Sequence, residues 1–394
     1  MANLAFPYAQ RMDGLSGSAI RELFAFSAKP GVISFAGGNP GVFALPDAQV
    51  AQIASALLRD NGKAILQYGQ TEGYPPLRQS LPVYIQDTFD TRVQENQVLV
   101  TTGSMQGLDL LLKALVNPGD AVLTESPAFL GALQAMSSYQ ANVVPVNSNE
   151  DGIDIDHLEE MMRKWRPKLL YIIPTFQNPT GRTLSLNRRE QVARLAARYE
   201  VVVAEDDPYR SLRYCGQHVP TLKSFDEEGW VVLLGSFSKV VSPGLRVGFM
   251  AGDAQLMRRC AVCKQCTDVH TANLNQAIVD AYLRDGLLPP HIDRICSQYA
   301  TLMDTMLSQL KEMPKMRHFT KPDGGLFIFA ELEKDVRATE LFRKAVERGV
   351  AFVPGEYFYP EGGHHNTLRL NFSNADRPAI LRGMEILADC IQQM

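Results

Sequence analysis

Short apolar runs alternate with stretches of helical periodicity through the middle of the chain. The apolar runs do not alternate with polar residues, which is typical of strands that are buried on both faces. These predicted strands are residues 97–101, 121–125, 142–146, 168–173, 201–205 and 231–235. The predicted helices between them include residues 105–116, 130–138 and 188–199. Strands separated by helices predict an α/β fold, with a mostly parallel sheet covered by helices on both faces.

The C-terminal part has a different pattern. Its predicted helices are residues 289–311, 339–348 and 377–392, and its predicted strands are residues 326–332 and 367–372. This order predicts a smaller α+β domain. The first 45 residues or so contain too few apolar residues to form a core of their own, so we expect them to join it. The predicted organisation is an N-terminal arm and part of the small domain (1–45), a large domain (46–288) and a C-terminal small domain (289–394).

Composition and charge exclude several classes of protein. The 394 residues include 39 lysines and arginines and 43 aspartates and glutamates, for a net charge of −4. This balance gives no basic surface for nucleic acid or for an anionic membrane. The chain contains no apolar stretch long enough to span a membrane and no N-terminal signal-peptide pattern. Its six cysteines are too sparse for a disulfide scaffold, so we expect a soluble cytoplasmic protein.

Polar motifs follow several of the predicted strands, where open α/β sheets bind their ligands. The first is the segment TGSMQG, residues 102–107. Its glycines allow close approach, Ser104 supplies a hydroxyl, and the start of the next helix offers free N–H groups to a phosphate. The alternative is that Ser104 is an ordinary helix N-cap.

Two further motifs carry an amide and a carboxylate. Residues 177–181, QNPTG, form a polar turn after a predicted strand. Asp206 follows the buried run VVVAE, and a carboxylate there is costly to desolvate unless it meets a cation or a hydrogen-bond donor. The alternative is that Asp206 merely caps the next turn.

A lysine follows the run VVLLG in the segment GSFSK, residues 235–239. Lys239 suits a covalent nucleophile if burial or neighbouring cations destabilise its ammonium group. Ser236, Ser238 and the later Arg246 would together bind a phosphate dianion. The alternative is a surface lysine in a loop.

An arginine lies inside the apolar strand LRLNF. The planar guanidinium of Arg369 suits a carboxylate, and the alternative is a structural ion pair. The motifs together supply a phosphate cup, a carboxylate for a heteroaromatic nitrogen, a lysine for an aldehyde and an arginine for a carboxylate. Pyridoxal 5'-phosphate acting on an amino acid requires all four.

At this point the sequence resembles the fold-type I, class I/II pyridoxal-phosphate-dependent aminotransferases. It is most similar to the group that contains 2-aminoadipate aminotransferase and kynurenine aminotransferase II. The resemblance extends from about residue 18 to the C-terminus, and order and spacing of the motifs both match. The motifs are SAIREL, ISFAGGNP, LQYGQTEGYPPLR, TTGSMQGLDLL, PTFQNPTGRTLS, AEDDPYRSLRY, GSFSKVVSPGLRVGF, FVPG and LRLNFS.

The resemblance implies roles for the cofactor-binding residues. Lys239 would form the Schiff base with the cofactor and later move the substrate α-proton, and Asp206 would pair with the pyridine nitrogen. Asn178 and Tyr209 would hydrogen-bond the 3′ oxygen of the ring. The implied phosphate ligands are Ser104, the backbone N–H of Met105, Ser236, Ser238 and Arg246.

Other positions bear on stacking, substrate and assembly. Phe129 would stack on the pyridine, although it lacks the hydroxyl of the tyrosine often found there. Arg369 would bind the substrate α-carboxylate, and Asn178 would also contact substrate. Arg21 would contact the distal end of the substrate. Gly38 lies where the backbone approaches the substrate, and Tyr68 would reach the active site of a partner subunit, which implies a homodimer with shared active sites.

This chain departs from the group at two further positions. Met105 stands where many relatives have glutamine, which removes one side-chain donor to the phosphate. Asn39 is polar where relatives often carry an apolar side chain. These departures leave the choice of substrate open.

Three cysteines give a competing signal. Cys260, Cys263 and Cys266 have the C-x₂-C-x₂-C spacing of an iron–sulfur run, with His270 four residues beyond. However, residues 253–268 are predicted to form one helix, on which the three thiols would spread over a broad arc. We therefore expect no metal site.

The predicted activity is transamination from an L-amino acid of the 2-aminoadipate, aromatic or branched-chain type to a 2-oxo acid such as 2-oxoglutarate, by a ping-pong mechanism. One alternative is another carbanion reaction of the same cofactor, such as that of a β-lyase or decarboxylase. Another is a transcription regulator with an aminotransferase-like domain, but SAIREL begins at residue 18 and leaves no room for its N-terminal DNA-binding module.

Overall fold

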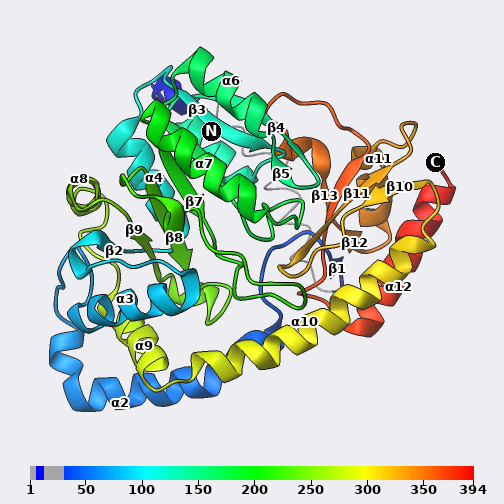
Figure 1. Cartoon of the computed structure of the whole chain (residues 1–394). Helices are drawn as coiled ribbons and strands as arrows, with labels where there is room; N and C mark the ends of the chain where they lie inside the picture. The colour runs from blue at the N-terminus through cyan, green and yellow to red at the C-terminus, as the bar shows by residue number, and fades with distance from the viewer. Residues whose placement is uncertain (1–5, 13–30) are drawn as a thin grey trace.

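The computed structural model describes residues 6–12 and 31–394 and is built around an eight-stranded sheet (Figure 1). Its strands are β2 (Val98–Thr101), β3 (Ala121–Ser126), β4 (Asn142–Asn149), β5 (Gly152–Ile153), β6 (Leu169–Ile172), β7 (Val202–Asp206), β8 (Val231–Ser236) and β9 (Gly248–Ala251). Their order across the sheet is β2-β9-β8-β7-β6-β3-β4-β5. Strands β4, β3, β6, β7 and β8 pair in parallel, whereas β9 and β5 are antiparallel to their neighbours. The predicted mostly parallel sheet is confirmed.

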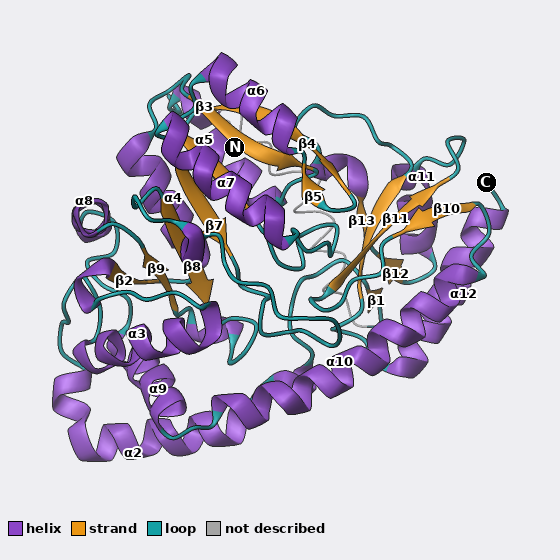
Figure 2. Ribbon diagram, viewed as in Figure 1, coloured by secondary structure: helices purple, strands orange, loops and turns teal. Residues whose placement is uncertain are grey.

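Alternate residues of the central strands pack into two separate hydrophobic cores. In β6, Leu169 and Tyr171 belong to one core, and Leu170 and Ile172 belong to the other. Helices α4 (Ser104–Leu115) and α5 (Leu130–Ser138) cover the first face, and α6 (Ile155–Trp165) and α7 (Leu186–Tyr199) cover the second (Figure 2). Both faces are therefore buried, which explains why the strands are apolar throughout.

Strand β9 was not predicted from the sequence. It lies between β2 and β8 and is antiparallel to both. The connection from β8 to β9 is short, so the chain reverses direction and β9 pairs directly with β8. Glycines allow this close pairing: a Cβ atom on Gly235 would lie 2.2 Å from the Phe249 ring, and one on Gly248 would lie 2.7 Å from the carbonyl oxygen of Gly235. The connection carries Lys239 and Arg246, so the hairpin holds both cations at one edge of the sheet.

A second, antiparallel sheet forms the smaller α+β part. Its strands, in spatial order, are β10 (Met316–Phe319), β11 (Phe327–Leu332), β14 (Thr367–Asn371) and β13 (Val353–Pro354). The accompanying helices are α10 (Leu288–Lys311), α11 (Ala338–Glu347) and α12 (Arg377–Gln392). Strand β1 (Ile33–Ser34) pairs in parallel with β12 (Val350–Ala351), so the chain just after residue 30 joins this part. The division at residues 45 and 288 stays a prediction.

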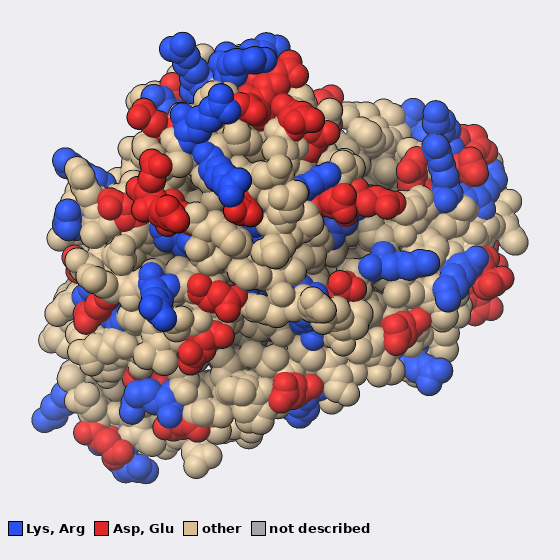
Figure 3. All heavy atoms as spheres, viewed as in Figure 1, with Lys and Arg blue, Asp and Glu red and all other residues tan. Residues whose placement is uncertain are grey.

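The remaining helices are α2 (Asp47–Ile65), α3 (Pro75–Phe89), α8 (Ala254–Gln265) and α9 (Asn273–Arg284), with 3-10 turns at Gln10–Met12, Val42–Ala44, Glu95–Gln97, Lys223–Phe225, Pro243–Leu245 and Gly355–Phe358. Helix α8 is shorter than the helix predicted over residues 253–268, because Asp253 caps its N-terminus and the chain leaves helical geometry after Cys266. In the described part of the chain, no helix has the length and apolar character needed to cross a membrane. Acidic and basic side chains are interspersed on the face shown in Figure 3.

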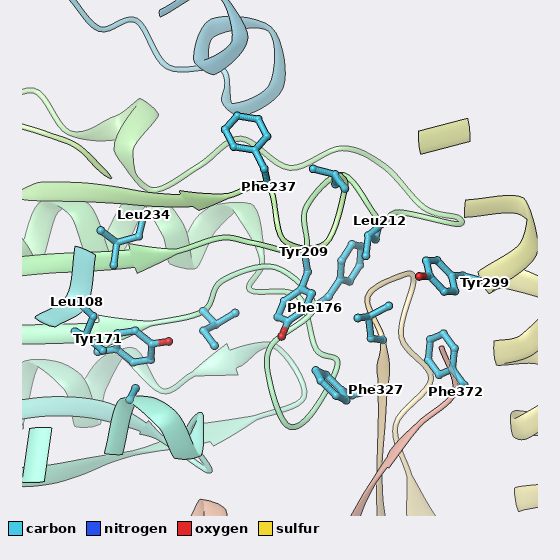
Figure 4. Close-up of a cluster of buried hydrophobic side chains, with 14 of the residues drawn as sticks. Leu108, Tyr171, Phe176, Tyr209, Leu212, Leu234, Phe237, Tyr299, Phe327 and Phe372 are labelled. Atoms are coloured by element: carbon cyan, nitrogen blue, oxygen red, sulfur yellow. The ribbon is translucent and has the colours of Figure 1, made fainter. Parts of the chain in front are cut away.

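One hydrophobic core connects the two sheets. It extends from Leu108 of α4 and Leu234 of β8 to Phe327 and Phe372 of the smaller part (Figure 4). Tyr209 lies between them, with its ring edge-on to Phe327 at a centroid distance of 5.8 Å. The ends of the large-sheet strands are thereby held against the small sheet, and the predicted site residues lie at this junction.

Candidate functional site

The carboxylate of Asp206 lies at the end of β7 on the face covered by α4. Ala204 pairs with Tyr171 of β6, and Asp206 is two residues further along β7, so it faces the same side of the sheet. The hydroxyl of Tyr171 donates to Oδ2 of Asp206 at 2.7 Å. Asp206 is buried, and its Oδ1 has no hydrogen-bond partner among the described residues. It therefore does not serve as a cap for the next turn, the alternative considered from the sequence.

Burial raises the pKa of Asp206 to about 6, although the nearby hydroxyls of Tyr171 and Ser104 act in the opposite direction. A carboxylate in such surroundings favours a partner that brings a proton or a positive charge. Sequence reasoning missed Tyr171. The signal was present, because a tyrosine in an otherwise aliphatic buried strand needs a partner for its hydroxyl.

Lys239 follows β8 and is half-buried, not exposed in a surface loop. Its Nζ donates to the carbonyl oxygen of Gly38 at 2.8 Å. Burial and the positive charges of Arg246 and Arg369 lower the pKa of Lys239 to about 8, against the opposing effect of Asp206. The amine is therefore much more easily deprotonated than an ordinary lysine, as a covalent nucleophile requires.

The turn before α4 and the β8–β9 connection form a cup of donors. Gly103, with φ of +84°, is the N-cap of α4, so Ser104 is the first residue of the helix and the N-cap alternative for it is wrong. Nη2 of Arg246 donates to the carbonyl oxygen of Thr102 at 3.1 Å. A Cβ atom on Gly103 would lie 2.6 Å from that same Nη2, so a side chain there would displace the guanidinium, and the positive φ also favours glycine.

The other predicted phosphate ligands lie on the same two segments. Met105 is the second residue of α4, where backbone N–H groups have no partner within the helix. On the facing connection, the N–H of Ser238 donates to Oγ of Ser236 at 3.2 Å. The helix start and the Arg246 side chain make this cup suited to an anion.

Arg369 of β14 is buried between two aromatic rings. Its guanidinium lies 4.3 Å from the ring centroid of Phe327 and 5.0 Å from that of Phe358. It donates to Oδ1 of Asn178 at 2.7 Å and to the carbonyl oxygen of Ala36 at 2.5 Å.

No carboxylate of the described residues forms a salt bridge with Arg369, so the structural ion pair considered from the sequence is not formed there. Its Nε is also without a partner in this part of the chain. Burial lowers the pKa of Arg369 to about 10, so the side chain remains a cation at neutral pH. A buried cation without a counter-ion is an appropriate receptor for a carboxylate ligand.

Asn178 and Tyr209 lie beside this arginine. Both side chains are buried. Burial raises the pKa of Tyr209 above that of an ordinary phenol, while the charge of Arg369 and the nearby Asn178 lower it. The Nζ of Lys239 lies 5.9 Å from the centroid of the Tyr209 ring. The structure thus brings the lysine, the tyrosine, the asparagine and the arginine to one place.

The remaining predicted residues are Gly38, Phe129, Tyr68 and Arg21, and the structure describes the first three. Gly38 packs so closely on the small sheet that a Cβ atom would lie 2.9 Å from the ring of Phe327. Phe129 is half-buried just before α5. Tyr68 is 81% exposed. Arg21 lies outside the described residues.

The three cysteines of the C-x₂-C-x₂-C run differ in their surroundings. Cys260 is buried and Cys263 is partly exposed on α8, whereas Cys266, just after the last residue of the helix, is exposed. His270 instead accepts a hydrogen bond at Nε2 from the N–H of Gly69. Among the residues that the structure describes, no group of three histidine, cysteine or acidic side chains could hold a metal ion.

These residues fit pyridoxal phosphate. The unpartnered Oδ1 of Asp206 can accept the N–H of a pyridinium, and the readily deprotonated amine of Lys239 can attack an aldehyde. The cup at Gly103, with Arg246 held beside it, suits the phosphate. The donor set of the site therefore agrees with the cofactor expected from the sequence.

Comparisons with known proteins agree with this chemistry. The model of the family described as aminotransferase class I and II matches residues 30–387. The 2-aminoadipate transaminase of Thermus thermophilus is 40% identical over 382 residues, covering 96% of this chain and 94% of that protein. The aromatic-amino-acid aminotransferase 1 of Thermococcus litoralis is 37% identical over 392 residues, covering 98% and 94%.

A solved aminotransferase structure has the same fold as this chain. The α-aminoadipate aminotransferase of Thermus thermophilus, complexed with N-(5'-phosphopyridoxyl)-L-leucine, superposes with a TM-score of 0.91 at 38% identity and covers 98% of this chain and 97% of that chain. The fold, the matched length and the cofactor chemistry lead to one conclusion. The chain belongs to the class I and II aminotransferases and is a pyridoxal-phosphate-dependent transaminase.

Proposed function

We propose that the protein moves the amino group of an L-amino acid of the 2-aminoadipate, aromatic or branched-chain type to a 2-oxo acid such as 2-oxoglutarate. The observation that carries this proposal is the buried guanidinium of Arg369, which has no carboxylate partner among the described residues. It lies close enough to Lys239 to lower the pKa of that amine. A substrate α-carboxylate at Arg369 would therefore present its α-carbon near Lys239.

Pyridoxal phosphate, when bound, supplies an aldehyde for the amino group and a ring that withdraws electrons from the α-carbon. Lys239 would be the catalytic residue, because its Nζ would hold the cofactor through that aldehyde and would remove and return the α-proton of the substrate. Oδ1 of Asp206 would accept a hydrogen bond from the protonated pyridine nitrogen, because Tyr171 occupies Oδ2. Asn178 and Tyr209 would hydrogen-bond the 3′ oxygen of the ring.

The phosphate group would be bound by Ser104, the N–H of Met105, Ser236, Ser238 and Arg246. Phe129 would stack on the pyridine. The donor amino acid would leave as a 2-oxo acid, and the acceptor 2-oxo acid would then take up the amino group at the same site. Both substrates carry the same α-carboxylate, so Arg369 and Lys239 serve both halves of a ping-pong reaction.

The substrate range is supported by the names of the relatives. These proteins act on 2-aminoadipate and on aromatic amino acids, and one was solved with a leucine adduct. We propose that Arg21 binds the distal acid group of substrates that have one, and that Gly38 leaves room for the substrate near the Lys239 amine. Asn178 would also contact the substrate, since it already orients Arg369.

We also propose a cytoplasmic homodimer in which Tyr68 completes the active site of the partner subunit. The exposure of Tyr68 supports this, since a large aromatic side chain in contact with water on one chain gains stability when a second chain covers it. The loop that carries Tyr68 is also anchored, because Nδ2 of Asn273 donates to the carbonyl oxygen of Gln67 at 2.8 Å.

The experiment that tests the substrate class measures each half-reaction separately by the absorbance of the cofactor. Arg369→Ala should lower the efficiency with 2-aminoadipate, glutamate, leucine and phenylalanine together. Arg21→Ala should lower it by about 10- to 100-fold for the two acidic donors only, the range expected for one arginine–carboxylate contact. A uniform loss with Arg21→Ala would contradict the role of that residue, and release of pyruvate and ammonia in place of amino transfer would contradict the proposed reaction.

A further inference from the structure

A fully buried lysine lies behind the phosphate cup and has no part in the function derived above. Lys264, on α8 between Cys263 and Cys266, is 0% exposed. Its Nζ donates to both carboxylate oxygens of Asp268 at 2.9 Å and to Oε1 of Gln106 at 2.7 Å. It also donates to Oγ1 of Thr271 at 3.1 Å, so the ammonium group is fully satisfied.

The acceptors of this ammonium group in turn hold Thr102, the residue before the Gly103 turn. The N–H of Thr102 donates to Oε1 of Gln106 at 2.8 Å. Its hydroxyl donates to Oδ2 of Asp268 at 3.0 Å. The Nε2 of Gln106 donates to that same Oδ2 at 2.7 Å, which closes the network.

The third polar group of Thr102 faces the cup. Its carbonyl oxygen accepts the hydrogen bond from Nη2 of Arg246. Every backbone and side-chain polar group of Thr102 therefore has a partner, two on the Lys264 side and one on the Arg246 side. A displacement of Thr102 would move both the guanidinium of Arg246 and the start of α4.

We propose that Lys264 is a positioning residue for the cofactor phosphate: through Asp268 and Gln106 it fixes Thr102, whose carbonyl group orients Arg246. The inference rests on the proposed use of Arg246 and the α4 N-terminus as phosphate ligands. Asp268 stays ionised in this network, because burial, which raises its pKa, is outweighed by hydrogen bonds from Lys264, Gln106 and Thr102 that lower it. The charged pair thus gives the turn one geometry before any ligand arrives.

The test compares the binding of pyridoxal phosphate with that of pyridoxal, which lacks the phosphate, by titration of the cofactor-free protein. For Lys264→Met we expect the Kd of pyridoxal phosphate to rise by about tenfold or more, in the range found when a residue that orients a ligand-binding group is removed. The Kd of pyridoxal should stay within about twofold, because Lys239 and Asp206 are untouched.

Lys223→Met is the matched control. The side chains of the Lys223–Asp226 pair are 9% and 1% exposed, with Nζ 2.7 Å from Oδ2, but the pair lies before β8, away from the cup. This variant can lose stability but should keep the wild-type ratio of the two Kd values. Thr102→Val, which keeps the branched shape and removes the hydroxyl, should raise the Kd of pyridoxal phosphate alone, and the double variant with Lys264→Met should add nothing further.

The inference would be overturned if Lys264→Met and Thr102→Val weakened the binding of pyridoxal phosphate and of pyridoxal equally, or left the ratio of the two Kd values unchanged. If Lys264→Met does not fold, the two Kd values of Thr102→Val decide whether the inference holds. Failure of the wild-type protein to bind pyridoxal phosphate would contradict the proposed function instead, so the two outcomes are distinguishable.

Discussion

Tyr171 and Asp206 form a buried pair in which the phenol donates to one carboxylate oxygen at 2.7 Å and leaves the other free. The pair exists because Tyr171 lies opposite Ala204, two residues before Asp206 on the same face of β7. One oxygen is thereby fixed by the protein and the other is available to the cofactor nitrogen. In the absence of cofactor, the carboxylate of Asp206 is therefore buried without its pyridinium partner, which makes the stability of the folded protein depend on pH.

Asp206→Asn should stabilise the cofactor-free protein near neutral pH. The pKa of Asp206 is raised from 3.8 to about 6 in the folded chain, so the folded state holds a proton that the unfolded state has lost. Stability therefore falls as pH rises from 4 to 6, by a total of about 3 kcal/mol. The variant should lack this loss, and its urea midpoint should exceed that of wild type at pH 7 but not at pH 4. If the urea midpoint of Asp206→Asn at pH 7 is lower than that of wild type, the negative charge of Asp206 is compensated within the folded protein and the prediction is wrong.

The two neighbouring aspartates should have separable roles. Asp206→Ala should abolish most transamination, because the pyridine nitrogen loses its partner. Asp207 instead forms a buried ion pair with Nε of Arg210 at 2.8 Å, and breaking such a pair costs about 3–5 kcal/mol of stability. Asp207→Ala should therefore lower the urea midpoint while the folded fraction keeps its activity. Equal loss of activity per folded molecule in both variants would show that the carboxylate is wrongly assigned.

Covalent attachment of pyridoxal phosphate to the cofactor-free protein should depend on pH through Lys239. Its pKa is lowered to about 8, so the reactive neutral amine becomes the main form above that pH. The attachment rate should rise with pH up to about 8 and then level off, as measured by stopped-flow absorbance. A rate that keeps rising to pH 10 would contradict the lowered pKa. As a control, borohydride should trap the cofactor on the peptide that contains Lys239, and not at all in Lys239→Ala.

The proposed exchange of Tyr68 between subunits can be tested by complementation. Tyr68→Ala and Lys239→Ala should each be nearly inactive alone. A mixed dimer has one intact site, with the wild-type Lys239 of one chain and the wild-type Tyr68 of the other. Random mixing should restore about one quarter of the wild-type activity, because half of the dimers are mixed and each has one working site of two. No recovery, with mixed dimers verified by mass spectrometry, would contradict the shared site.

The sequence by itself determined most elements and the main chemical groups of the site. The apolar runs predicted β2, β3, β4, β6, β7 and β8, because a strand buried on both faces is a local pattern. The motif spacing placed Asp206 and Lys239 after strands, since parallel strands end at one edge. It also identified Arg369, because a cation inside an apolar strand needs an anionic partner.

Only the tertiary structure decided which groups meet these residues. Tyr171 and Asp206 are 35 positions apart, Gly38 and Lys239 are 201 apart, and Ala36 and Arg369 are 333 apart. Such contacts depend on strand register and on the packing of one sheet against the other, which no local pattern encodes. The same holds for Lys264, which the sequence presents as an ordinary lysine between cysteines. Its role follows from the packing of α8 against α4, which buries the ammonium group beside Gln106 and Asp268.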